Sequence, residues 1–170
     1  MNEIEEMTNV LKFLSTAEIT TCSEFLKIVS LLDEVLETIF KIEISGTKFS
    51  ITDKNIIGPL FGDLLDLFAI WVSYTIGHIS EQNSEDYKIR RSGLEFLLER
   101  YKEFPNGKDK SLESALNNFR ITEDIEGLDE MFNSKKYVYD TQMFYGSSDE
   151  PTLNAQDIEH VPLSHWWWRS

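Results

Sequence analysis

Residues 59–80, PLFGDLLDLFAIWVSYTIGHIS, decide the fold of this chain because they form its most apolar stretch. Apolar residues recur at helical spacing from Leu60 to Trp71, and further aliphatic and aromatic residues fill the other directions. A helix that is apolar nearly all round is buried in a bundle or spans a membrane. Pro59 suits the first turn of such a helix, because its missing N–H costs nothing there. We therefore expect a central apolar helix over about residues 60–80.

Two carboxylates argue against a transmembrane helix here. Asp63 and Asp66 lie inside the stretch, one turn apart, and a carboxylate is costly in lipid. No cluster of lysines or arginines flanks the stretch to orient it in a membrane. A core helix is therefore favoured, although the length approaches the ~20 residues that a span needs. As first-turn acids favoured by the helix dipole, the two aspartates would instead place the helix start near Gly62.

Amphipathic segments on both sides of this stretch predict further helices. Apolar spacing predicts helices over 4–14, 24–41 and 85–103, and the caps Ser111 and Thr122 predict short helices over 112–119 and 123–132. We expect the helices over 24–41 and 85–103 to pack on the central one. The fold class is therefore mainly α, a helical bundle around a central apolar helix. A chain of 170 residues is typical of a single domain, here 1–170 with residues 146–170 as a C-terminal segment docked on the body.

Residues 41–52, KIEISGTKFSIT, interrupt the helical period. Apolar and polar residues alternate on both sides of Ser45-Gly46-Thr47. This pattern predicts a small β-hairpin near 42–52. The alternative is an extended linker.

The net charge of −14 is concentrated toward the C-terminus. Residues 121–170 carry ten acids and three bases, which is half of the net charge. Such a field repels nucleic acid and attracts basic proteins, so we expect a basic protein partner and no nucleic acid. The acidic start, MNEIEEM, is unlike a signal peptide, and one cysteine permits no internal disulfide. These features favour the cytoplasm, with no membrane association. Nothing in the sequence indicates an oligomeric state.

Motifs that would assign an enzyme are missing from the sequence. There is no HExxH, no glycine-rich phosphate loop and no GxSxG. The histidines His78, His160 and His165 have no cysteine or second histidine at zinc-ligand spacing. His78 lies near the end of the central helix, where a cation favours the helix dipole; a phosphotransfer histidine is the alternative. We expect no enzymatic activity, no catalytic residue, no metal and no cofactor.

An acidic run followed by tyrosines is the candidate partner-binding site. Carboxylates steer association and tyrosines anchor contacts, whereas the alternative is simply a solvated helix face. The candidate residues are Glu123, Asp124, Glu126, Asp129, Glu130, Tyr137, Tyr139 and Asp140. By contrast, Arg91, Glu95 and Glu99 are i,i+4 neighbours on the most charged helix, and they predict a face of mixed charge rather than a basic patch.

The chain closes with the run Pro162-Leu163-Ser164-His165-Trp166-Trp167-Trp168. Three exposed indoles would favour aggregation, so we expect them to dock on the body of the protein rather than on a partner. With this tail, the acidic helical character resembles the immunity proteins of bacterial polymorphic-toxin and contact-dependent growth inhibition systems.

That resemblance implies a small cytoplasmic protein that binds and neutralises a cognate toxin. A nuclease is the expected target, because its phosphate-binding cleft is basic. The resemblance assigns no role to individual residues. Two alternatives remain open from the sequence. One is a helical regulatory or adaptor protein, or an acidic nucleic-acid mimic that inhibits a DNA-binding protein. The other is a hydrolase with carboxylate chemistry.

Overall fold

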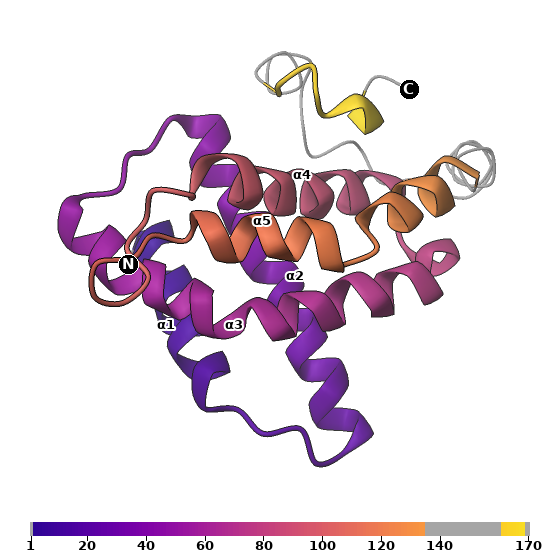
Figure 1. Cartoon of the computed structure of the whole chain (residues 1–170). Helices are drawn as coiled ribbons and strands as arrows, with labels where there is room; N and C mark the ends of the chain where they lie inside the picture. Colours follow the sequence, from indigo (N-terminus) through magenta and orange to yellow (C-terminus); the bar gives the residue numbers. More distant parts are fainter. Residues whose placement is uncertain (1, 135–160, 169–170) are drawn as a thin grey trace.

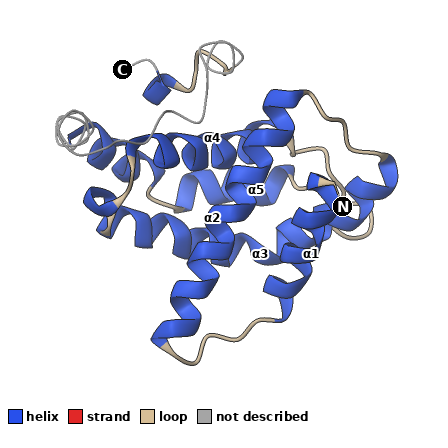
Figure 2. Cartoon of the chain, turned by 180° about the vertical axis from the view of Figure 1, so that it is seen from behind, coloured by secondary structure: helices blue, strands red, loops and turns tan. Residues whose placement is uncertain are grey.

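The computed structural model describes residues 2–134 and 161–168, and the regular elements in these ranges are helical (Figures 1 and 2). The elements are α1 (Glu3–Thr16), α2 (Cys22–Ser45), α3 (Ile51–Gly77), α4 (Ser84–Arg100), α5 (Glu113–Thr122) and the 3₁₀ turns Ile79–Glu81 and Trp166–Trp168. Residues 125–134 are also helical. The prediction of a mainly α fold is confirmed.

Helix α2 shares the centre of the bundle with the apolar helix α3. It packs against α1, α3 and α4, whereas α3 packs chiefly against α1 and also meets α2 and α5. Figure 1 shows α3, α5 and α4 as one layer with α2 crossing behind it, and Figure 2 shows the same crossing from the other side. The expectation that the helix over 85–103 packs on the apolar helix is corrected, because α4 packs chiefly on α2.

The apolar helix begins earlier than the sequence suggested. The Ser50 hydroxyl accepts a hydrogen bond from the Asp53 N–H at 3.0 Å, and the Asp53 carboxylate accepts one from the Ser50 N–H at 3.2 Å. This reciprocal pair is a capping box, and it starts α3 at Ile51. Pro59 therefore lies inside the helix rather than at its start.

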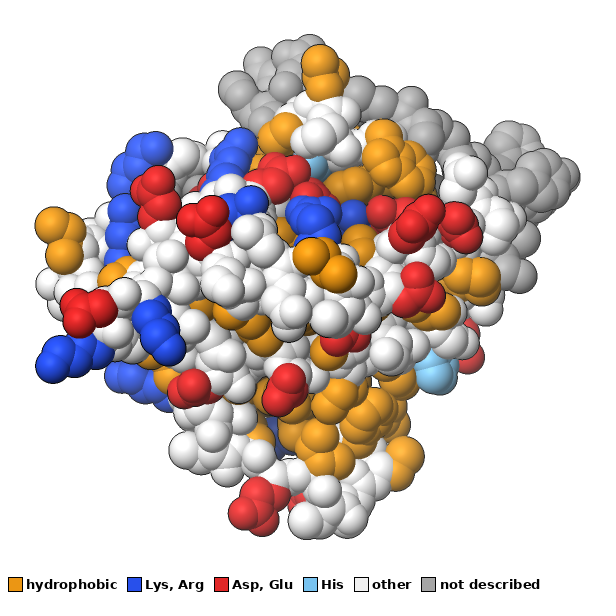
Figure 3. Space-filling view, in the orientation of Figure 1, with side chains coloured by type: hydrophobic (Ala, Val, Ile, Leu, Met, Phe, Trp, Pro, Cys, Tyr) orange, Lys and Arg blue, Asp and Glu red, His pale blue; other side chains and the backbone are white. Residues whose placement is uncertain are grey.

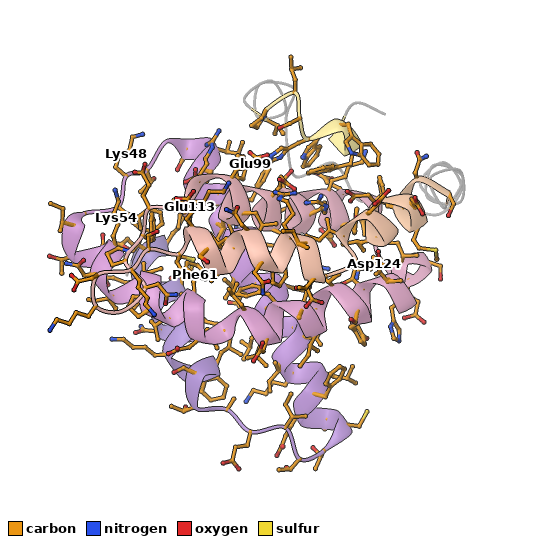
Figure 4. The ribbon with its side chains drawn as sticks, viewed as in Figure 1. Lys48, Lys54, Phe61, Glu99, Glu113 and Asp124 are labelled. Carbon is orange, nitrogen blue, oxygen red and sulfur yellow. The ribbon has the colours of Figure 1, made fainter. Side chains whose placement is uncertain are left out.

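Asp63 and Asp66 lie on the exposed side of α3. Neither Asp63 nor Asp66 is in the first turn, so the alternative start near Gly62 is wrong. By length and composition α3 would pass for a membrane span, but so would the core helix of a bundle. In the described structure its buried face, which includes Phe61 and Trp71, packs in the core. Figure 4 labels Phe61, whose ring lies 5.7 Å from that of Tyr101.

The hairpin expected near 42–52 is absent from the described structure. Ile42 and Ile44 belong to α2, and Gly46 closes that helix in the left-handed region with φ 72°. The N–H groups of Gly46 and Thr47 donate to the carbonyls of Glu43 and Ile42, at 3.4 and 3.2 Å. This is the glycine C-cap of a helix, and it uses the same residues that suggested a hairpin turn.

Candidate functional site

The acidic run after α5 begins a new helix. The Asp124 carboxylate accepts a hydrogen bond from the Gly127 N–H at 2.9 Å, and so caps residues 125–134. Figure 4 shows Asp124 at the turn that follows α5. Thr122, the expected cap, is instead the last residue of α5. Asp124 is exposed, but its carboxylate already has a structural role.

Asp129 forms an ion pair inside the protein and is not part of an exposed acidic surface. Its two carboxylate oxygens accept hydrogen bonds from Nε and Nη2 of Arg91, at 2.7 and 3.0 Å. Arg91, which belongs to α4, is only 2% exposed. Its bidentate hydrogen bond to Asp129 therefore holds residues 125–134 against α4. The Asp129 carboxylate therefore has a structural role, although it also lines the groove described below.

Arg91 and Glu95 anchor a charged network between three helical segments. Nη1 of Arg91 donates to Oε1 of Glu95 at 2.9 Å, and Arg120 of α5 also donates to Glu95. The guanidinium of Arg91 lies 4.3 Å from the ring centre of Trp167. Arg91 and Glu95 are both buried, so these mixed charges lie inside the protein rather than on its surface.

The network stays ionised because its members stabilise each other. Burial alone would raise the pKa of Glu95, but the charges and hydrogen bonds of Arg91 and Arg120 lower that pKa to about 2. Burial alone would lower the pKa of Arg91, whereas Asp129 and Glu95 raise it above its ordinary value. Each buried charge is thus compensated by its partners.

Glu126 and Glu130 are the acids of this segment that remain open to a partner. Both are exposed and line a groove of about 520 Å³ together with Arg91, Arg120, Ile125, Asp129, Asn133 and Trp166. Trp166 is 37% exposed. A basic side chain in this groove would meet two carboxylates and an indole, which attract cations. It would also lie near Arg120, whose charge is compensated by Glu95. Figure 3 shows acidic side chains gathered at the end of the molecule where residues 125–134 follow α5.

Glu123 lines a different hollow from Glu126 and Glu130. It is half-buried, and the hollow of about 390 Å³ is otherwise formed by Phe25, Ala69, Ile70, Ser73 and Tyr74 of α2 and α3. Figure 3 shows an uncovered apolar area over these two helices. The remaining candidates, Tyr137, Tyr139 and Asp140, lie outside the described residues.

A single hydroxyl, that of Ser92 in α4, holds the terminal tryptophans. The indole N–H groups of Trp167 and Trp168 donate to Ser92 Oγ at 3.0 and 2.7 Å, and Nδ1 of His165 lies 2.9 Å from the same atom. Since indoles only donate, they fill both acceptor sites of the hydroxyl, which must donate its proton to His165. His165 then carries its own proton on Nε2, which lies 3.7 Å from Oε2 of Glu99.

The tail thus completes one wall of the candidate groove. Trp167 is buried, Trp168 is half-buried and stacks on Phe40 at 5.8 Å, and Trp166 remains at the surface beside Glu126 and Glu130. The sequence offered no local signal for this arrangement, because Ser92 and the tryptophans are more than 70 residues apart.

Among residues 2–134 and 161–168, no group of three His, Cys, Asp or Glu side chains is placed to hold a metal ion. Comparisons with protein-family models, with curated proteins and with solved structures gave no match.

Proposed function

We propose that this chain binds a basic protein through the groove lined by Glu126, Glu130 and Trp166. The observation that carries the proposal is that the acids of this segment differ in their contacts. Asp124 and Asp129 are engaged in holding the segment in place, whereas Glu126 and Glu130 lie exposed beside an indole. An interface of this kind combines steering charges with an aromatic anchor.

The buried network supports this function by making the segment rigid. Arg91 fixes Asp129 through two hydrogen bonds, so Glu126 and Glu130 are presented from an ordered helix. A preorganised surface loses less conformational entropy on binding. The net charge of −14 adds long-range attraction, which accelerates association with a basic partner.

In its finer form, the proposal is that the partner is a cognate bacterial toxin and that binding neutralises it in the cytoplasm. A nuclease is the favoured target, because a cleft that binds phosphates attracts acidic proteins. In this role the chain acts by binding alone, without catalysis, a cofactor or a membrane. The support is the acidic character, the helical fold and the tail that resembles those of immunity proteins.

Co-expression with the product of the neighbouring reading frame tests the proposal. If that product is toxic alone, cells that also make this chain should survive, and the two proteins should co-purify as a complex. The matched control is the variant Glu126→Lys/Glu130→Lys, which should protect less while keeping its helical spectrum. Equal toxicity with and without this chain would refute the immunity role. A non-toxic neighbour that nevertheless binds would assign the chain to a regulatory or adaptor role instead.

A further inference from the structure

A further hollow lies between α2, the C-terminal end of α3 and the first turn of α4. Its volume is about 440 Å³, and three carboxylates line it, those of Asp33, Glu81 and Asp86. Tyr74 is shared between this hollow and the one that Glu123 lines. We call it the Asp33 pocket.

The Asp33 pocket holds more negative than positive charge. Arg90 is the one arginine or lysine among its lining residues, so three carboxylates face one guanidinium. Nη1 of Arg90 lies 3.6 Å from Oδ2 of Asp33, but Nε of Arg90 is hydrogen bonded to Glu37 at 3.1 Å. Arg90 is thus shared between Asp33 and Glu37, so the Asp33 pocket keeps an excess of carboxylate charge.

Two acids at this site have pKa values that are raised chiefly by burial. Burial raises the pKa of Asp33, and the hydrogen bond from Trp71 and the charge of Arg90 only partly oppose this. Burial likewise raises the pKa of Glu37 despite Arg90, and the charge of Asp86 adds to the rise in both. A raised carboxylate pKa means that added positive charge is favourable at that position. A bound cation would supply the same compensation as a proton.

The walls of the Asp33 pocket suit a flat cation with several N–H groups. The rings of Tyr74 and His78 stack at 4.0 Å with an interplanar angle of 14°. Nδ1 of His78 donates to the Tyr74 carbonyl at 2.9 Å, which fixes the orientation of the imidazole. An aromatic face beside carboxylates is the kind of surface that a guanidinium binds.

We propose that the Asp33 pocket binds a guanidinium or alkylammonium group. Asp33 and Asp86 compensate its charge, and the Tyr74–His78 stack contacts its flat face. The group can belong to a free amine or to an arginine or lysine side chain, which present the same chemistry. This inference does not rest on the proposed function, because the protein alone suffices to test it.

Trp71 provides the readout for a titration with butylguanidinium. Its indole N–H donates to Oδ1 of Asp33 at 2.6 Å, so cation binding should shift the indole resonance of Trp71 in a ¹H–¹⁵N spectrum in a saturable way. The indole resonances of Trp167 and Trp168, which are bonded to Ser92, should stay in place. Butylurea, a neutral molecule of the same shape, should produce no saturable shift.

Two variants locate the binding. Asp86→Asn removes one charge and keeps the side-chain shape, and it should weaken butylguanidinium binding by about fivefold or more. Glu34→Gln removes an exposed carboxylate of α2 that does not line the pocket, and it should leave the dissociation constant unchanged.

Two further ligands distinguish a protein side chain from a free amine as the natural source of the cation. They are a short blocked peptide with one arginine and the polyamine spermidine. Tighter binding of the peptide assigns the pocket to a protein side chain, whereas tighter binding of spermidine assigns it to a free polyamine. Equal shifts with butylguanidinium and butylurea, an unmoved Trp71 resonance at millimolar cation, or equal weakening by both variants would each overturn the proposal.

Discussion

Gly93 of α4 lies so close to the carbonyl oxygen of Leu36 in α2 that a β-carbon on Gly93 would overlap it. The obstacle is backbone, which cannot rotate away as a side chain can. Gly93→Ala should therefore force the two helices apart and destabilise the protein by about 3 kcal/mol, the upper end for overpacking. For a domain of this size, the thermal midpoint should fall by roughly 6–12 °C.

Gly77 gives the matched control for that substitution. It ends α3, and a β-carbon there would have no atom within 4 Å. Gly77→Ala should change the thermal midpoint little or raise it slightly, since alanine limits the unfolded chain more than glycine does. Similar losses in both variants would mean that the Gly93–Leu36 approach does not set the packing of α4 on α2.

Removing the Ser92 hydroxyl should loosen the C-terminal tail. Ser92→Ala deprives two buried or half-buried indole N–H groups of their shared acceptor, which should cost about 1–3 kcal/mol. We expect a red shift of tryptophan emission and faster proteolysis near residues 161–168. Ser114→Ala, on the exposed side of α5, is the control. Unchanged emission and proteolysis in Ser92→Ala would show that the hydroxyl does not hold the tail.

The buried network predicts a specific loss of stability in acid. The pKa of Glu95 in the folded protein is lowered to about 2 from 4.5, so the folded state binds fewer protons than the unfolded state between these values. Its contribution, of about 3 kcal/mol, is present above pH 4.5 and is lost as the pH falls toward 2.

Urea unfolding of the wild type and of Glu95→Gln at several pH values measures that contribution. The difference in unfolding free energy between the two proteins should be largest above pH 4.5 and should shrink toward pH 2. Asp33 and Glu37 act in the opposite sense, because their raised pKa values make the folded state bind more protons as the pH falls. Their effect is common to both proteins and cancels in the difference. A difference that does not vary with pH would contradict the assigned ionisation of Glu95.

Asp129 and Glu130 are adjacent acids with different expected roles. Asp129→Asn weakens the pairing of buried Arg91, so it should lower the unfolding free energy by about 3 kcal/mol. Glu130→Gln should leave the unfolding free energy within about 0.5 kcal/mol, as exposed substitutions usually do. Chemical denaturation of both variants measures this contrast, and equal losses would show that Asp129 is not a structural acid.

The sequence predicted the helical fold well because apolar periodicity is a local signal. The predicted start of α3 was wrong because Pro59 also suits the first turn of a helix. The Ser50–Asp53 capping pair, which is also visible in the sequence, sets the true start. The predicted β-hairpin near 42–52 was wrong because a left-handed glycine such as Gly46 suits both a hairpin turn and a helix C-cap.

The candidate site was less predictable because its geometry depends on distant partners. Asp129 and Glu130 look alike in the sequence, and only the position of Arg91, 38 residues from Asp129, distinguishes them. The same holds for Ser92 and the terminal indoles. A single sequence contains no local pattern that reveals such pairs.

Association kinetics with the co-expressed partner test the central claim most directly. The variant Glu126→Lys/Glu130→Lys changes the groove, whereas Glu5→Lys/Glu6→Lys changes the net charge by the same amount on exposed positions of α1. If the groove binds a basic protein, the groove variant should slow association by about tenfold or more at low salt. The α1 variant should slow it far less. Equal association rates for the wild type and the groove variant, or equal slowing by the two variants, would contradict the claim.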